Sequence, residues 1–222
     1  MSDNLGKYHF LSWARRGVAT AIDNPDQGSL PDRASLNVQL TLSVQKDGAT
    51  SAVTPPAMKV EMFGPGDVIG IDPRHIIRTE PRNFTVNFEP NYLCGIEFDT
   101  PDFPWLVTPA APKNDKLRPW LALVVLKPEE FIFAKTAPNP LPVIEVQKIE
   151  PLPHLADSWN WVHVQVSGDT PLASAMTSAP GTVISRLLCP RRLDPETTYY
   201  AFLVPAFEIG RQAGLGDRKS VV

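Results

Sequence analysis

Histidine and carboxylate side chains are the residues of this chain that could bind a metal ion or move a proton. His154, Asp157 and His163 lie within ten residues of one another, and His75 follows Asp72 three positions on. A zinc site on one helix needs two histidines four residues apart, and a zinc finger needs paired cysteine or histidine ligands. Neither pattern occurs here. The sequence therefore predicts no metal ion and no other cofactor.

Nucleophilic catalysis has no recognisable motif in this sequence. No G-x-S-x-G elbow surrounds Ser174 or Ser185. Cys94 and Cys189 belong to no C-x-x-C pair, and we expect two buried reduced thiols, with a disulfide between them as the open alternative. The two acids of a glycosidase can lie far apart in sequence, but no pair of carboxylates stands out. We therefore expect that the protein is not an enzyme.

A glycine-rich segment, residues 64–70, superficially resembles a phosphate-binding loop. Its glycines, Gly64, Gly66 and Gly70, do not follow the dinucleotide-binding spacing, and no lysine stands where a P-loop requires one. No clear helix follows whose first turn could hold a phosphate. The segment is predicted to form turns between strands.

The overall composition excludes several classes of protein. The 222 residues are 43% hydrophobic and 20% charged, which excludes wholesale disorder. The formal net charge of −3 excludes nucleic acid as the main binding partner. The 24 prolines exclude long helical bundles, because proline breaks helices. The longest apolar run, Trp120–Leu126, has seven residues, whereas a membrane-spanning helix needs about 20. With no signal peptide visible, we expect a cytoplasmic protein with no direct membrane span.

Strict alternation of apolar and polar residues marks the clearest strand, from Leu36 to Gln45, and Lys46-Asp47-Gly48 closes it with a turn. The apolar residues expected to face the core are Val38, Leu40, Leu42 and Val44. Further strands are predicted at residues 58–63, 84–88, 96–98, 117–127, 161–166 and 198–204, and short helices at 171–176 and 182–188. The predicted fold class is mainly β, an antiparallel β-sandwich or open barrel with an N-terminal helix and short appended helices.

The N-terminal segment Leu5–Ile22 is predicted to be an amphipathic helix, because Leu11, Ala14 and Val18 recur at helical spacing. Its apolar stripe would cover either the core or a neighbouring subunit. The predicted organisation is an N-terminal helix over residues 1–24, a β-rich domain over 25–210 and a flexible tail over 211–222.

An aromatic, proline-rich segment, Phe98–Pro109, has two open interpretations: a rigid interface loop or a lid over the core. If the stripe and this loop both serve assembly, the candidate interface residues are Leu11, Trp13, Val18, Phe103 and Trp105.

Four stretches together carry a resemblance to a known family. They read FLSWARRG at residues 10–17, DFPWLVTPA at 102–110, LRPWLALVVL at 117–126 and SRLLCPRRL at 185–193, which continues into YYAFLVPAFE at 199–208. They are similar to bacterial proteins encoded among the genes of extracellular, phage-tail-like contractile injection systems. The similarity covers most of residues 8–216 and includes no catalytic motif.

The resemblance implies a non-enzymatic structural subunit of the injection particle, at or around its baseplate. Its partners would be other subunits of that particle, with several copies in a symmetric assembly in the cytoplasm. The alternative function is a β-sandwich binding module for a glycan or a protein. Trp159 and Trp161 would then share one strand face and stack on a sugar ring.

Overall fold

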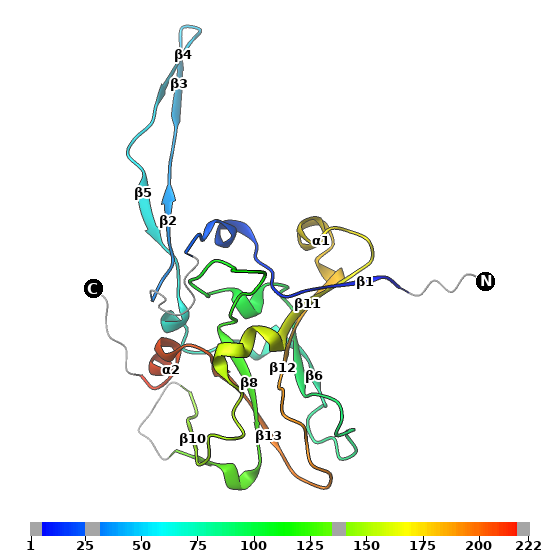
Figure 1. The fold of residues 1–222 in the computed structure, drawn as a ribbon. Helices are drawn as coiled ribbons and strands as arrows, with labels where there is room; N and C mark the ends of the chain where they lie inside the picture. The colour runs from blue at the N-terminus through cyan, green and yellow to red at the C-terminus, as the bar shows by residue number, and fades with distance from the viewer. Residues whose placement is uncertain (1–5, 25–31, 135–140, 217–222) are drawn as a thin grey trace, which may run out of the picture.

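The computed structural model describes residues 6–24, 32–134 and 141–216 and confirms a mainly β fold with antiparallel sheets. A body of packed strands carries one long hairpin that projects away from it (Figure 1). The described strands form one five-stranded and four two-stranded sheets and no closed barrel. The strands are β1 Tyr8–Leu11, β2 Ser35–Val38, β3 Leu42–Lys46, β4 Ala49–Val53, β5 Met58–Glu61, β6 Ile76–Glu80, β7 Gly95–Phe98, β8 Leu121–Leu126, β9 Phe131–Phe133, β10 Ile144–Val146, β11 Val162–Ser167, β12 Val183–Leu188 and β13 Tyr200–Pro205.

The helices are short, as the proline content predicts. Within the described residues, the α-helices are α1 Leu172–Ser178 and α2 Glu208–Gly214. The 3₁₀ turns there are η1 Gly17–Ala21, η2 Pro65–Asp67, η3 Pro73–His75, η4 Phe103–Trp105, η5 Pro128–Glu130, η6 Leu155–Trp161 and η7 Pro180–Thr182. None of the described helices combines the length and the apolar character needed to cross a membrane.

The five-stranded sheet has the order β1-β11-β12-β7-β6 and turns one face to the core. On β11, Val162, Val164 and Val166 are buried while the residues between them are partly exposed, as the alternation predicts. On β12, Val183 and Leu187 are buried on the same pattern. The period of two therefore selects the buried face of both central strands.

Strand β8 lies at the centre of the body and buries all six of its side chains. It pairs with β13 along its length. Leu123 and Val125 join the main core, whereas Val124 and Leu126 join a second cluster with Phe131. Because apolar layers cover both faces, every position of this strand has to be apolar, which explains the run read from the sequence.

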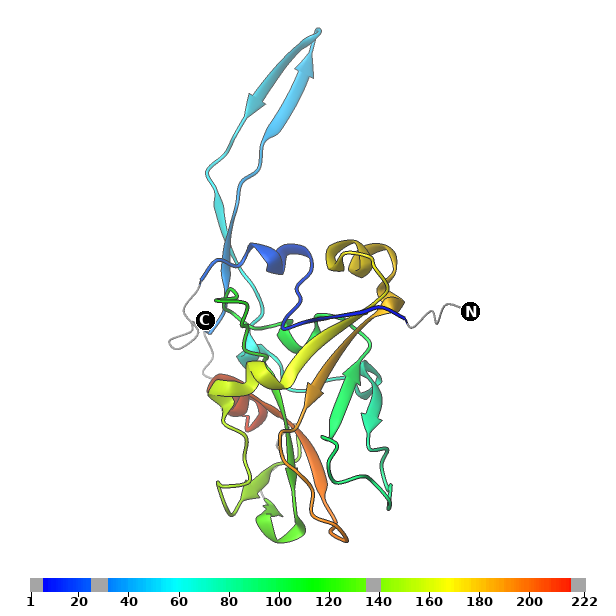
Figure 2. The same cartoon turned by 45° about the vertical axis from the view of Figure 1, so that its right-hand side comes forward.

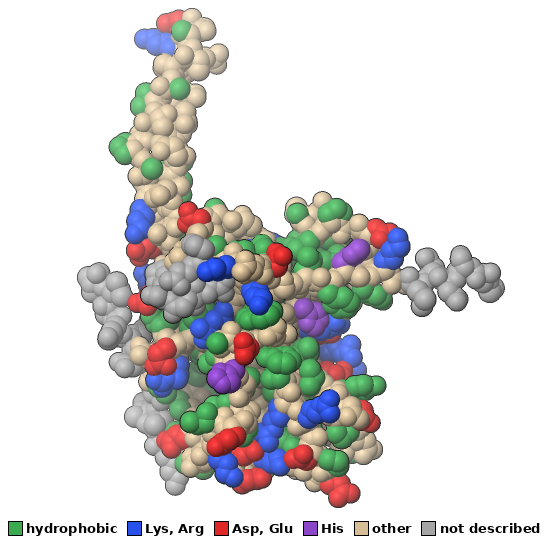
Figure 3. Space-filling model, in the orientation of Figure 1, with side chains coloured by type: hydrophobic (Ala, Val, Ile, Leu, Met, Phe, Trp, Pro, Cys, Tyr) green, Lys and Arg blue, Asp and Glu red, His purple; other side chains and the backbone are tan. Residues whose placement is uncertain are grey.

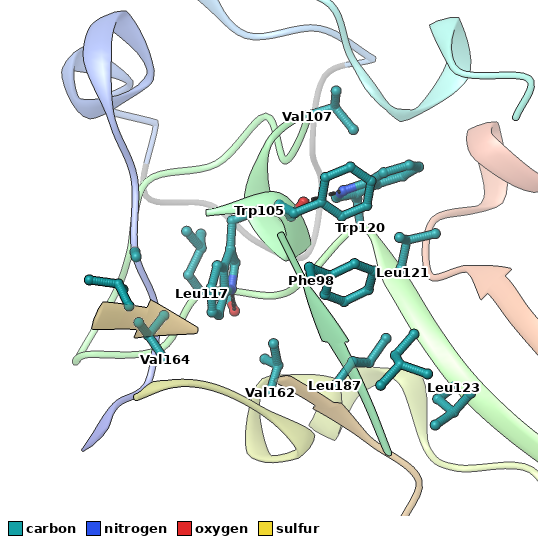
Figure 4. Packing of buried hydrophobic residues seen from close by; sticks show 14 of the residues in the cluster. Phe98, Trp105, Val107, Leu117, Trp120, Leu121, Leu123, Val162, Val164 and Leu187 are labelled. Carbon is teal, nitrogen blue, oxygen red and sulfur yellow. Dashed lines mark hydrogen bonds between the residues drawn. The ribbon is translucent and has the colours of Figure 1, made fainter. Parts of the chain in front are cut away.

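The aromatic segment is a lid over the core, not an interface loop. Phe103 and Trp105 are 3% and 0% exposed. The indole N–H of Trp105 donates to the carbonyl of Leu117 at 3.0 Å, and the indole N–H of Trp120 donates to the carbonyl of Phe103 at 2.7 Å (Figure 4). Each tryptophan thus ties its own segment to the other one.

The predicted N-terminal helix is wrong. Residues Tyr8–Leu11 form β1, the edge strand beside β11, and the chain then makes the short turn η1. Gly17 has a φ of +57°, which interrupts a continuous helix. Before Gly17, residues Tyr8–Leu11 pair instead with the edge of β11 through backbone hydrogen bonds. Residues 1–5 of the predicted helix lie outside the described residues. The N-terminal segment is thus part of the main sheet and not a separate helical element.

Three other predictions also need correction. Residues 84–88 form a loop instead of a strand, with Phe84 at a φ of +64° and fully exposed. In the predicted helix 182–188, Val183–Leu188 form strand β12 instead, because the five-stranded sheet buries their alternate side chains. The predicted flexible tail begins inside α2, where Ala213 is buried, and residues 217–222 lie outside the described residues.

The two cysteines are buried and unbonded, as the sequence predicts. The backbone N–H of Cys189 donates to the carbonyl of Cys94 at 2.8 Å, so the two residues lie on adjacent segments. Burial raises the pKa of the Cys94 thiol to about 11 and raises that of Cys189 as well. Both thiols are protonated at neutral pH and have low reactivity.

A buried ion pair closes the end of β8. The Glu130 carboxylate accepts two hydrogen bonds from the Arg191 guanidinium, at 2.5 and 2.8 Å, and one from the backbone N–H of Lys127 at 2.8 Å. Arg191 also donates to the carbonyl of Val125 at 2.9 Å. The hydrogen bonds from Arg191, followed by that from Lys127, lower the pKa of Glu130 to about 2.

Replacing the lid tryptophan tests its role in the core. We expect Trp105→Ala to lower the free energy of unfolding by about 3–5 kcal/mol, because it leaves a large cavity and an unpaired Leu117 carbonyl. The neighbouring Leu106 is 47% exposed, so Leu106→Ala should cost less than about 1 kcal/mol. Urea unfolding followed by circular dichroism measures both. If both substitutions lowered the free energy of unfolding equally, the position of Trp105 in a buried lid would be contradicted.

The buried ion pair predicts a pH-dependent stability. Because the pKa of Glu130 is lowered on folding, the pair stabilises the protein above the unfolded-state pKa of about 4.3 and loses that effect as the pH falls towards 2. Glu130→Gln should therefore cost about 2 kcal/mol at pH 7, and the difference from the parent protein should shrink below pH 4. Denaturant titrations across this range measure it, and a difference independent of pH would contradict the assignment.

Candidate assembly surface

The hairpin formed by β2, β3, β4 and β5 projects from the body as a separate arm, residues 35–61 (Figures 1 and 2). Its tip is a two-residue turn in which Asp47 and Gly48 have φ of +51° and +81°, the signature of a type I′ hairpin. At ~3.3 Å per residue the outgoing strand from Ser35 to Asp47 is about 40 Å long. The predicted turn at Asp47-Gly48 is thus confirmed, and the predicted strand is divided into β2 and β3.

The arm has one apolar face and one polar face. In β3 and β4, Leu42 lies opposite Val53 and Val44 lies opposite Ser51; in β2 and β5, Val38 lies opposite Met58. We call the side that carries these residues and Leu36, Leu40 and Val60 the apolar face. The other face carries amide and hydroxyl groups, including Thr41 and Thr54, whose side-chain oxygens are 3.4 Å apart.

Two prolines keep the apolar residues on one face. Between the two paired halves of the arm, the outgoing strand has three residues, 39–41, and the return strand has four, 54–57. The extra residue, at Pro55-Pro56, is a bulge that shifts the return strand by one position. Val53 and Met58 therefore both face the same side although their positions differ in parity.

The apolar face is exposed to solvent along most of its length. Leu42, Val44, Val53 and Met58 are between 57% and 62% exposed. The expectation that Val38, Leu40, Leu42 and Val44 lie in the core is therefore wrong. Alternation correctly indicated a strand with one apolar face, but beyond the root no element of the described chain covers this face.

Charged residues stand at the ends of the arm and not along it. Lys46 and Asp47 lie at the tip, Lys59 and Glu61 lie at the root, and the residues between them are uncharged (Figure 3). Monomeric proteins commonly protect an exposed strand with charges, which discourage pairing with other chains. An uncharged apolar sheet face in water is instead typical of a contact surface.

A salt bridge fixes the root of the arm to the body. Arg33 donates to the Asp67 carboxylate at 2.9 and 2.5 Å, and the hydrogen bond raises the pKa of Arg33. The same carboxylate accepts the backbone N–H of Gly64 at 2.9 Å. At Gly64 a Cβ would lie 1.9 Å from the carbonyl oxygen of Asp32, so the two chain segments meet too closely for any larger residue.

A small hydrophobic cluster continues the apolar face of the arm into the body. Ala19 and Ile22, from η1 and its C-terminal end, pack with Ala34, and Leu36 and Met62 lie against them. The first residues of the apolar face are therefore already covered by the chain itself. The exposed part begins where η1 ends.

The five candidate interface residues fall into separate environments. Leu11 and Trp13 are half-buried and pack on the main core, and Phe103 and Trp105 are buried in the lid. Val18, on η1 at the root of the arm, is 69% exposed. Of the five, only Val18 remains a candidate contact. Phe103 and Trp105 were wrong as exposed anchors, because their rings fill the space between β7 and β8.

The exposed apolar residues of the arm were the part of the candidate surface that sequence reasoning missed. The signal was the strict alternation from Leu36 to Gln45 combined with the absence of charge and with Pro55-Pro56 in the return segment. A core strand and an unpartnered arm share the alternation, so that pattern alone could not separate them.

The side chains that could do chemistry do not converge. Among residues 6–24, 32–134 and 141–216, no group of three histidine, cysteine or acidic residues could hold a metal ion. The His75 ring nitrogen lies 3.0 Å from a carboxylate oxygen of Asp99 on the surface. Burial, and then the positive charge of Arg186, lowers the pKa of His163. The Ser185 hydroxyl is buried and donates to the carbonyl of Thr100.

The tryptophan pair proposed to stack on a sugar is not on a strand face. Trp159 and Trp161 both lie in η6, before β11 begins. The ammonium group of Lys116 lies 3.7 Å from the centre of the Trp159 ring. The ring face is therefore occupied by a cation, and the paired platform predicted from the i, i+2 spacing is wrong.

A glycine substitution tests how the root positions the arm. We expect Gly64→Ala to cost about 2–3 kcal/mol, because the added carbon meets the Asp32 carbonyl and the backbone has to shift. Gly181→Ala is the matched control, since no atom lies within 4 Å of the added carbon. Thermal unfolding and limited proteolysis of the arm measure the effects. If Gly64→Ala left the stability unchanged, the close approach of Gly64 to the Asp32 carbonyl would be contradicted.

Comparison of the chain with protein-family models, with curated proteins and with solved structures gives no match. The candidate surface is therefore defined by its own residues. It consists of the apolar face of the arm and, beside its root, Val18.

Proposed function

We propose that this protein is a non-enzymatic structural subunit of a multiprotein particle and joins a neighbouring subunit through its arm. The observation that carries the proposal is the exposed, uncharged apolar face, which runs from Val38 to Val44 over about 20 Å of the arm. A two-stranded hairpin has little stability in water, so an arm of this length gains most from a protein that covers it.

The particle we propose is a phage-tail-like contractile injection system, with this subunit at or around the baseplate. The support is the resemblance of four stretches of the sequence to proteins encoded with such systems. These stretches include the lid, β8 and β12, which build the core of the body. The resemblance therefore supports the choice of particle, because it covers the segments that form the body. The exposed apolar face of the arm supports the proposed role in assembly.

The proposal places the protein in the cytoplasm as part of the assembled particle. Its partners are other subunits, with several copies in a symmetric arrangement. A repeated subunit benefits from a rigid body with one extended contact element, because the same contact then recurs at each position of the assembly.

Incorporation into the particle tests the proposed function. We expect Leu42→Asp to reduce the amount of this subunit in purified particles at least about tenfold, because it places a charge in the apolar contact. Ser43→Asp, on the polar face of the same strand, should be incorporated normally. Mass spectrometry of particles, with the tube and sheath proteins as reference, gives the occupancy.

Two outcomes would contradict the proposal. One is full incorporation of both variants, which would mean that the arm makes no essential contact. The other is that no such particle contains the chain. Circular dichroism of both purified variants should match the parent protein, since Leu42 lies outside the core clusters.

A further inference from the structure

Two buried thiols face each other where strands β7 and β12 meet. Leu188 of β12 lies opposite Gly95 of β7, and the antiparallel register continues to the next pair, Cys189 opposite Cys94. Directly opposed residues of an antiparallel pair project their side chains to the same side of the sheet. Both thiols therefore enter the same core cluster, where Cys94 is 6% exposed and Cys189 is 0% exposed.

We propose that Cys94 and Cys189 form a reversible redox pair, which closes to a disulfide between β7 and β12 under sustained exposure to a small disulfide oxidant. The structure describes the reduced form of this pair. The pair belongs to the body and does not involve the arm. It therefore goes beyond the proposed function, and its test is separate.

The backbone spacing of the pair is compatible with a disulfide. The backbone N–H of Cys189 donates to the carbonyl of Cys94, and Cα atoms of such a hydrogen-bonded pair are about 5.5 Å apart, within the ~4.4–6.8 Å that disulfides span. Cβ atoms of opposed residues are about 4.5–5.5 Å apart, whereas a disulfide needs about 3.5–4.5 Å. Closing the bond therefore draws the two strands together slightly. A bond closed under such strain is easily reduced again, which makes the pair reversible.

The residues beside the thiols allow the strands to approach. A Cβ added to Gly95 would lie 2.7 Å from a methyl carbon of Leu188 and 3.4 Å from the carbonyl oxygen of Leu187, so the strands are already close there. Cys94 immediately precedes β7 and Cys189 immediately follows β12. Both thiols thus lie at the end of the ladder, where the backbone can shift with the least loss of strand pairing.

The exposure of the thiols sets the order of the reaction. The Cys94 thiolate, from the more exposed residue, attacks a sulfur of the oxidant disulfide and releases one small thiolate. The Cys189 thiolate then attacks the Cys94 sulfur of this mixed disulfide and releases the second small thiolate. The protein loses two protons and two electrons and gains one S–S bond, while the oxidant disulfide is reduced to two thiols.

The surroundings of the thiols make this reaction slow at neutral pH. Burial, and then the charge of the neighbouring Cys189, raises the pKa of Cys94 to about 11. Burial also raises the pKa of Cys189, although hydrogen bonds from the backbone of Arg191 and Val125, and then the charge of Arg191, lower it in part. Because the thiolate is the attacking species, the rate should rise about tenfold for each unit between about pH 7 and about pH 9.

The disulfide would join two connections that are separate in the reduced form. Cys94 ends the loop of residues 81–94, and Cys189 ends β12 two positions before Arg191. The Arg191 guanidinium pairs with Glu130 at the end of β8. The oxidised form would therefore hold the base of this loop against the connection that carries the buried ion pair.

Oxidation of the folded full chain tests the redox pair. We would incubate the purified protein with the disulfide of β-mercaptoethanol at about pH 8.5, quench with acid, alkylate in urea and measure the intact mass. We expect a product about 2 Da lighter that takes up no alkylating reagent, and recovery of both thiols on addition of excess β-mercaptoethanol. Cys94→Ala and Cys189→Ala, as matched controls, should give no such product.

The unfolded chain provides the reference for the folded geometry. In mixtures of β-mercaptoethanol and its disulfide, the equilibrium ratio of disulfide to dithiol should be at least about tenfold higher for the folded protein than for the chain in urea. Unfolding separates the two thiols by a long loop, whereas the fold holds them opposite each other. This comparison uses the unsubstituted chain, so it does not depend on whether the alanine variants fold.

Trypsin cleavage after Arg82, in the exposed loop, tests the effect of the bond. We expect the oxidised protein to be cut there at least about threefold more slowly than the reduced protein, because the base of the loop is held in place. The variant with both cysteines replaced by alanine should be cut at the same rate before and after oxidant treatment. Equal rates for the two forms of the unsubstituted protein would overturn the proposed hold on the loop.

Two outcomes would overturn the redox pair itself. One is a folded chain that keeps both thiols after a day of incubation, under conditions that oxidise the chain in urea. The other is accumulation of the mixed disulfide on Cys94 without closure to the internal bond. Either result leaves the proposed function untouched, since incorporation into particles is tested on the arm.

The converse also holds. If Leu42→Asp is incorporated normally, the proposed contact through the arm fails while the mass change on oxidation still decides the redox pair.

Discussion

Two tryptophans hold the body of this protein together by reciprocal hydrogen bonds between the same two segments. Trp105 in the lid donates to Leu117 before β8, and Trp120 before β8 donates back to Phe103 in the lid. Both indoles are buried, so each N–H needs this partner. The Phe103 ring stacks on Phe98 of the five-stranded sheet, with centroids 4.8 Å apart, and so joins β8 to β7. The arrangement explains why the most aromatic segment of the chain is unavailable for binding another protein.

The arm differs from the body because it has no second layer to bury its apolar side chains. A hairpin has two strands and one layer, so its apolar face has no core of its own. The salt bridge between Arg33 and Asp67 and the cluster around Ala34 support the root, but they reach no further than the first residues. Beyond them, the alternation that buries half of a strand in the body leaves the same side chains in water. The described chain therefore combines a body with a packed core and an arm whose single-layered sheet leaves its apolar face exposed.

Absence of charge separates this arm from a protected surface hairpin. Charged residues at Lys46, Asp47, Lys59 and Glu61 mark its two ends, and Pro55-Pro56 interrupts only the return strand. The bulge at these prolines keeps Val53 and Met58 on one face, which gives the arm a continuous apolar side. A surface built only to remain soluble would not require this alignment. In physical terms the arm has the patterning of a core strand and the position of a surface element.

The sequence by itself determined the mainly β class, the buried run of β8, the inward face of β11 and the Asp47-Gly48 turn. Each follows from a local rule: the period of two, an apolar run covered on both faces, or the positive φ that glycine tolerates. Tertiary structure decided the rest. Tyr8–Leu11 became a strand because β11 offers an open edge, and residues 183–188 became a strand because the sheet continues there. It also placed Trp105 inside, where the sequence had left an interface loop and a lid open, and it placed Leu42 outside, where the sequence had predicted a core position. Periodicity records which residues share a face, but only the packing of distant segments determines whether anything covers that face.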